Sequence, residues 1–127
     1  MASLADSLDR VMAVQGVRAA ALIDIETGMV VRSMGMQGSG FPAAAASLAD
    51  EARLARAVLE SGEATESAEA GDLDEISVVT SGHLHLCKIL PTRPGDDLLL
   101  FVDLDRNQVN MALASLQVRQ LAPAVLA

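Results

Sequence analysis

The stretch VQGVRAAALIDIETGMVV, residues 14–31, decides the fold. Its centre, residues 18–25, is an almost continuous apolar run, which is typical of a strand covered on both faces. The chain then turns at residues 26–28 and resumes as an apolar segment at Met29. Gly28 suits the positive φ angle that such a turn requires. The stretch therefore predicts a β-hairpin whose first strand lies inside a sheet.

Helices are expected on either side of this hairpin. Ser3 is a good N-cap, and the apolar residues after it fall on one helical face that ends near Gly16. A longer helix is expected to start near Pro42 and to run to about Glu60, where Gly62 stops it. The hairpin is thus flanked by a short amphipathic helix and a long one.

Three further strands follow. Residues 98–102 are as apolar as the first strand, so we expect these two strands to be central and adjacent. Residues 76–80 and 83–86 alternate more and fit a peripheral position, joined by a tight turn at residues 81–82.

The last helix is expected to begin at Asp105 or Asn107 and to end at Pro123. Apolar residues at helical spacing line one face of it, namely Val109, Ala112, Leu113 and Leu116. The element order is therefore α-β-β-α-β-β-β-α. It predicts a mixed α/β fold with a five-stranded, mainly antiparallel sheet and helices on both faces. At 127 residues we expect one domain over residues 1–127, with its core at about 3–121.

The composition disfavours several classes of function. The formal net charge is −8, and the chain has no Trp or Tyr and only two Phe residues. This charge opposes contact with nucleic acid or an anionic membrane, and stacking platforms for bases are missing. Cys87 is the only cysteine, which indicates a reducing compartment. We expect a cytoplasmic protein that neither binds nucleic acid nor inserts into a membrane.

One acidic segment carries nearly all of the charge imbalance. Residues 60–75 hold seven of the 17 acidic residues and no Lys or Arg. Two interpretations stay open: a solvated loop, or an electrostatic docking strip for a basic partner. The candidate docking residues are Glu63, Glu66, Glu69 and Asp72.

No catalytic, cofactor or metal site is expected. His83, His85 and Cys87 alternate along one strand and are metal-ligand types, but the chain has no other His or Cys to complete a site. We interpret them as ordinary strand residues. The glycine-rich residues 35–40 lack the Lys and Ser or Thr of a phosphate-binding loop. Nucleophile and base motifs are also missing, so we do not expect an enzyme.

The long helix carries two apolar stripes. One stripe, which contains Leu48 and Ala52, is enough for a helix that rests on a sheet. The second stripe either reflects the helix propensity of Ala or forms a helix–helix contact across a homodimer; we favour the contact. The candidate interface residues on this stripe and on the following strand are Ala43, Ser47, Leu54, Ala57, Val58, Ile76 and Val78.

These features together resemble the Roadblock (dynein light chain) family. The V-x-G-V-x-A-A motif lies at residues 14–20 and the D-x-x-T-G turn at residues 24–28. The next features follow in the order of that family. They are an Ala-rich helix, a connector that contains Gly and acidic residues, and the strand E-I-S-V at residues 75–78.

The resemblance implies a profilin-like α/β/α sandwich that pairs through its second helix and third strand. It also implies a non-enzymatic, homodimeric adaptor or regulator that binds a Ras-like small GTPase or a signalling or motility complex. Bacterial relatives include a GTPase activator that works as a homodimer, and the Ala-rich, Lys-poor composition suits a GC-rich bacterial genome. The resemblance gives no reason to treat Arg53 or Arg56 as an arginine finger, that is, an arginine inserted into the active site of the GTPase. The alternatives are a small-molecule sensor of the PAS or GAF type, which requires an interior polar pocket, and a purely structural scaffold subunit.

Overall fold

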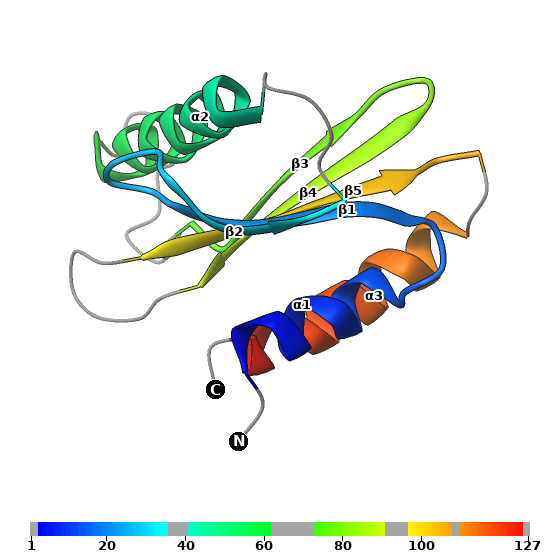
Figure 1. Cartoon of the computed structure of the whole chain (residues 1–127). Coiled ribbons are helices and arrows are strands. Elements are labelled where there is room, and N and C mark those ends of the chain that lie inside the picture. The colour runs from blue at the N-terminus through cyan, green and yellow to red at the C-terminus, as the bar shows by residue number, and fades with distance from the viewer. Residues whose placement is uncertain (1–2, 36–40, 62–72, 91–96, 108–109, 126–127) are drawn as a thin grey trace.

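Nine helices and strands follow one another in the described part of the chain, in an order that confirms the predicted one (Figure 1). The computed structural model describes residues 3–35, 41–61, 73–90, 97–107 and 110–125. The last element, η1, is a short 3₁₀ helix. The bounds are α1 (Leu4–Met12), β1 (Val17–Asp24), β2 (Val30–Met34), α2 (Phe41–Ser61), β3 (Glu75–Val79), β4 (His83–Leu90), β5 (Leu98–Asp105), α3 (Met111–Leu121) and η1 (Ala122–Ala124).

The strands form one antiparallel sheet in the order β2-β1-β5-β4-β3. The predicted adjacency of β1 and β5 is confirmed, with Ala20 opposite Val102 and Leu22 opposite Leu100. Both strands of the β3–β4 hairpin are predicted to be peripheral. The prediction is confirmed for β3, which lies at the edge of the sheet. The expectation is wrong for β4, because β4 pairs with β5 on its other side and has buried residues on both faces.

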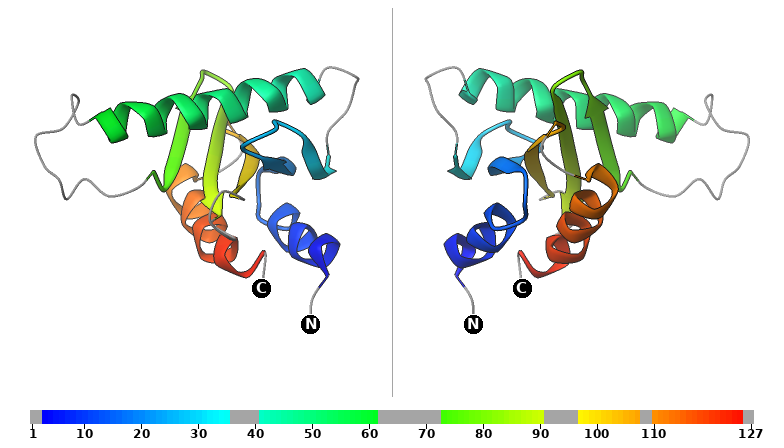
Figure 2. Two further views of the ribbon diagram at one scale, coloured as in Figure 1. Left: turned by 90° about the vertical axis from the view of Figure 1, so that its left-hand side faces the viewer. Right: turned by 90° about the vertical axis from the view of Figure 1, so that its right-hand side faces the viewer.

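The sheet is the middle layer of three. α2 lies across one face, and α1, α3 and η1 lie side by side on the other (Figures 1 and 2). Each face has its own buried cluster, and alternate residues of β1, β4 and β5 belong to each. Ile23, Cys87 and Leu99 belong to the cluster under α2, whereas Leu22 and Leu86 belong to the cluster under α1 and α3.

The first helix begins as its sequence predicts. The Ser3 Oγ accepts a hydrogen bond from the Asp6 N–H at 3.1 Å, and the Asp6 carboxylate accepts one from the Ser3 N–H at 3.2 Å. This reciprocal pair is a capping box, and it satisfies backbone donors that the first helical turn leaves without partners.

The last helix differs from its prediction. α3 begins at Met111 with Asn110 as N-cap, so the expected starts at Asp105 and Asn107 are wrong. The reason is that β5 continues to Asp105, which pairs with His83 of β4. The face of α3 that meets the core consists of Ala114, Ser115 and Val118. The face marked by Ala112, Leu113 and Leu116 points outward instead; Val109 lies outside the described residues.

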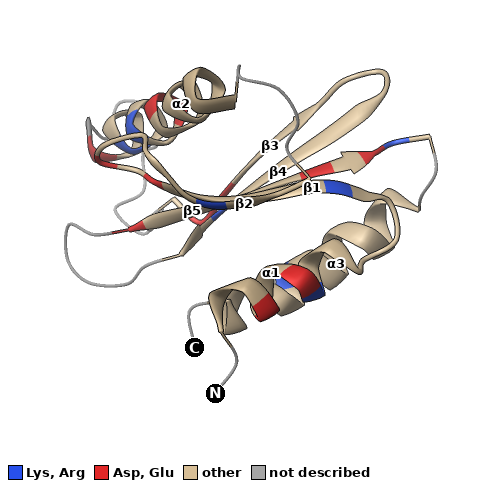
Figure 3. Cartoon of the chain, in the orientation of Figure 1, with Lys and Arg blue, Asp and Glu red and all other residues tan. Residues whose placement is uncertain are grey.

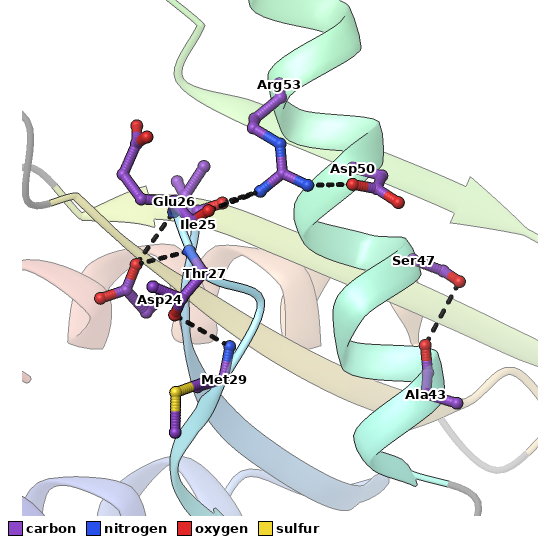
Figure 4. A network of polar contacts seen from close by, with 9 residues as sticks. All are labelled: Asp24, Ile25, Glu26, Thr27, Met29, Ala43, Ser47, Asp50 and Arg53. Carbon is purple, nitrogen blue, oxygen red and sulfur yellow. Dashed lines mark hydrogen bonds and ion pairs between the residues drawn. The ribbon is translucent and has the colours of Figure 1, made fainter.

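The turn between β1 and β2 is held by side chains as well as by backbone. The Asp24 carboxylate accepts hydrogen bonds from the N–H groups of Glu26 at 2.9 Å and Thr27 at 3.2 Å (Figure 4). The Gly28 N–H donates to the Asp24 carbonyl at 2.8 Å. Gly28 has φ +75°, as the sequence predicts for this turn.

The same turn lies against α2. A Cβ atom added at Gly28 would lie 3.0 Å from the Cα atom of Ala46. Gly28 therefore serves both the backbone conformation of the turn and the close approach of the turn to the helix.

No helix among the residues described here is both long and apolar enough to cross a membrane.

Gly28→Ala tests both roles of Gly28, in the turn conformation and in the close approach of the turn to α2. We expect a loss of at least about 1–2 kcal/mol in the free energy of unfolding, because an L side chain is strained at this φ angle and its Cβ would crowd α2. Gly82→Ala is the matched control, since a Cβ there would meet no atom within 4 Å. We expect that change to stay within about 0.5 kcal/mol. Urea denaturation of both variants measures the difference, and equal losses would contradict this account of Gly28.

Candidate partner interface

The outward stripe of α2 is an exposed, largely apolar surface. Its predicted members Ala43, Ser47, Leu54, Ala57 and Val58 are all exposed. Of the two large apolar side chains among them, Leu54 is 67% exposed and Val58 is 51% exposed. A leucine side chain in water forgoes about 1.5–3 kcal/mol of burial free energy, so this position favours contact with another surface.

The opposite side of α2 rests on the sheet through small side chains. Ala45, Ala49 and Ala52 are fully buried there, and Leu48 and Phe41 pack around them. The helix therefore divides into two stripes, as its sequence predicts.

Strand β3 is an edge strand of the sheet. Among the described strands it pairs with β4 alone. Ile76 packs partly into the cluster under α2, and Val78, two residues on, is exposed on the same face. The C-terminal end of α2 extends past β3 in both views of Figure 2. Leu54, Ala57 and Val58 of α2 and Val78 of β3 are called the α2–β3 surface below.

The acidic residues at the start of β3 are paired within the chain. Two nitrogen atoms of Arg119 donate to the two carboxylate oxygens of Glu75, each at 2.8 Å. This bidentate bond is the main reason why the pKa of Glu75 lies below its usual value, although partial burial opposes the shift. Lys88 pairs with Asp74 at 2.6 Å. From Ile76 to Cys87 the hairpin carries no Lys, Arg, Asp or Glu (Figure 3).

Both arginines of α2 bind groups of their own chain. Arg53 donates to the backbone carbonyls of Ile25 and Glu26 and pairs with Asp50 (Figure 4). Arg56 pairs with Asp97 at 2.5 Å. These contacts tie α2 to the first hairpin and to the start of β5.

The histidines of β4 lie beside an acidic residue that sequence reasoning missed. The Nδ1 atom of His83 is 2.8 Å from the Oδ1 atom of Asp103, and the Nε2 atom of His85 is 3.4 Å from the same oxygen. Asp103 lies directly opposite His85 in the pairing of β5 with β4. Finding this cluster from the sequence requires the register of two strands, which local patterns do not specify.

Cys87 is buried, whereas the two histidines are partly exposed. It is 2% exposed in the cluster under α2. Burial, reinforced by Glu51 and Glu75, raises the pKa of the thiol to about 12. The thiol is therefore protonated at neutral pH and is a poor metal ligand.

Several predicted residues lie outside the described part of the chain. They are the candidate docking residues Glu63, Glu66, Glu69 and Asp72, together with most of the glycine-rich loop.

A groove of about 520 Å³ lies between α1 and α3. Arg10, Gln117 and Leu113 are among its lining residues. It lies at the surface, whereas a small-molecule sensor of the PAS or GAF type requires an interior pocket with converging polar groups.

The three layers, the strand order and the helix placement are those of a Roadblock/LC7 fold. No protein-family model matches the chain, and no curated protein sequence matches it. Solved structures do match. MglB from Myxococcus xanthus has a TM-score of 0.76 and 16% identity, covering 97% of this chain and 90% of that chain.

Two further structures agree with this assignment of the fold. The Roadblock/LC7 domain from Streptomyces avermitilis has a TM-score of 0.68 and 19% identity, with 94% of this chain and 90% of that chain covered. A structure of MglB with a tetrameric arrangement has a TM-score of 0.73 and 17% identity, with 96% and 84% covered. The resemblance found in the sequence is confirmed at the level of the fold.

Glu75→Gln tests the tie between β3 and α3. The lowered pKa of Glu75 means that the ion pair contributes fully above the ordinary carboxyl pKa of 4.5 and is lost as the pH falls through the lower folded value. At pH 7 we expect the variant to lose about 1 kcal/mol of unfolding free energy, since the pair is partly exposed. Below the folded pKa the difference from the parent chain should shrink, because Glu75 is then neutral in both.

Urea denaturation at neutral and acidic pH measures this difference. Glu26→Gln is the control, because the Glu26 side chain is exposed. A loss at Glu75 that is independent of pH would refute the electrostatic account.

Proposed function

We propose that this chain is a non-enzymatic, homodimeric regulator that acts on a Ras-like small GTPase in the cytoplasm of a bacterium. The observation that carries the proposal is the exposed apolar α2–β3 surface on a Roadblock/LC7 fold. The sequence resemblance supports it, because the family it implies includes bacterial homodimers that activate small GTPases.

The geometry of the sheet favours a particular dimer. An edge strand offers unpaired backbone N–H and C=O groups to another strand. Two copies of β3 related by a two-fold axis perpendicular to the sheet would pair antiparallel and join the two sheets. The same axis would leave both α2 helices on one face, where Leu54 and Val58 of each copy would lie near the other helix. Val78 would belong to the same contact.

The two ends of α2 then have different roles. Ala43 lies about 16 Å and Ser47 about 10 Å from Leu54 along the helix, at 1.5 Å per residue. They therefore lie away from the end of α2 that passes β3 (Figure 2). We assign Leu54, Ala57 and Val58 to the dimer, with Ile76 supporting Val78 from below. We assign Ala43 and Ser47 to the surface that faces the regulated partner.

Leu54→Asp tests the dimer. We expect the variant to be monomeric yet folded, because the side chain is exposed in the monomer, whereas two charges would be buried without partners in the dimer. Light scattering gives the mass, and circular dichroism gives the melting curve. Leu113→Asp is the matched control, since Leu113 is 54% exposed on α3, on the other face of the sheet. A dimeric Leu54→Asp chain would rule out this interface.

A binding and turnover experiment tests the regulatory role. We expect the purified chain to bind a Ras-like GTPase of the same organism with a dissociation constant below about 10 µM in at least one nucleotide state. GTP hydrolysis is measured with and without the chain, and a change of rate supports regulation. Binding without any change of rate would support a scaffold instead. No binding in either nucleotide state would reject the GTPase as partner.

A further inference from the structure

Three potential metal ligands converge on the face of the sheet that carries α2. His83 and His85 are two residues apart on β4, so their side chains share a face. Asp103 is the register partner of His85 on β5. One ligand atom from each residue lies within 4.8 Å of the others. We propose that His83, His85 and Asp103 form a binding site for a divalent transition-metal ion, for which Zn²⁺ is the probe.

The distances suit such an ion. Ligand atoms held about 2.0–2.2 Å from a tetrahedral Zn²⁺ lie roughly 3.4 Å apart. The carboxylate oxygen of Asp103 is 3.4 Å from the Nε2 atom of His85 and 2.8 Å from the Nδ1 atom of His83. To hold the ion, the Nδ1 atom of His83 would have to move about 0.6 Å away from the Asp103 oxygen. The ligand atoms of the two histidines, which lie within 4.8 Å of each other, would have to adopt the same spacing of about 3.4 Å.

The chemistry of the donor set points to the same class of ion. Two imidazoles and one carboxylate are a usual set of three protein ligands at zinc sites that leave the fourth position open to water. The carboxylate also offsets part of the charge of a divalent cation. The buried, protonated Cys87 thiol is not needed for the set.

The site is both accessible and held in place. The side chains of His83 and His85 are 38% and 35% exposed, and that of Asp103 is 19% exposed. The hairpin end of β3 and β4 extends beyond α2 (Figure 1), so an ion can approach from solvent. The rings of His85 and Phe101 pack edge to face, with their centroids 5.2 Å apart. This contact restrains the imidazole.

The residues paired with the three ligands across the sheet carry no positive charge. The residues paired across the sheet on either side are Ala19, opposite Asp103, and Val78, opposite His85. Arg106 follows the end of β5, and its guanidinium donates to the Thr80 carbonyl at 2.8 Å.

A bound ion would join the β3–β4 hairpin to the central strand. Val78 is part of the α2–β3 surface and lies opposite His85. The metal would therefore stiffen the strand pair next to that surface, whether or not the proposed GTPase partner is correct.

Metal titration of the tag-free chain, stripped with a chelator, tests the site. We expect one equivalent of Zn²⁺ to bind in calorimetry. Co²⁺ should give the visible bands of a low-coordinate nitrogen and oxygen site without a thiolate charge-transfer band. We expect each of three variants, His83→Ala, His85→Ala and Asp103→Asn, to weaken Zn²⁺ binding by at least about 100-fold. Mutation of residues that only hydrogen-bond to metal ligands already lowers metal affinity about 10–100-fold.

Cys87→Ala is the matched control and should bind Zn²⁺ as the parent chain does. Circular dichroism checks that each variant is folded, and His85→Gln replaces any His85→Ala chain that is not. Binding that survives in all three ligand variants, loss of binding in Cys87→Ala, or no stoichiometric binding by the parent chain would overturn the proposal. In the last case the histidines and Asp103 form only a hydrogen-bonded cluster.

Discussion

The pairing of β1 with β5 is the constraint on which the rest of the structure depends. Both strands bury side chains on both faces, for example Leu22 and Ile23 on β1 and Leu99 and Leu100 on β5. Such a pair requires a helical layer above and another below, because neither face tolerates water. It also places β2 on one side and the β4–β3 hairpin on the other, so β3 becomes the edge next to α2. The candidate interface is thus a consequence of how the centre is built.

Local patterns were sufficient for the parts of the fold with local causes. The Ser3 cap, the turn at Gly28 and the two stripes of α2 depend on residues a few positions apart. The burial of β4 and the start of α3 depend instead on pairing between distant strands. Polar residues late in β5 suggest the end of a strand, yet pairing with β4 continues the strand to Asp105. The outward direction of Leu113 was missed because periodicity identifies a face without saying which neighbour it meets.

The candidate site divides in the same way. The exposure of Leu54 follows from helical periodicity alone, whereas the meeting of His83 and His85 with Asp103 follows from register. α2 has features of both kinds, because its two sides follow from periodicity and its arginines bind segments that are distant in the sequence. Its inner side of small residues fits the sheet, Arg53 and Arg56 anchor it to neighbouring segments, and its outer side is left for contact. A change on the outer side therefore tests the proposed assembly without disturbing the core.

The burial of Cys87 has a practical consequence for studying this molecule. A thiol that is both covered by α2 and protonated at neutral pH reacts slowly with thiol-specific reagents. A second cysteine placed on the surface can then carry a fluorophore or spin label without removal of the natural one. The native thiol, for its part, becomes a reporter of the helical layer above it, since its reactivity rises only when α2 separates from the sheet.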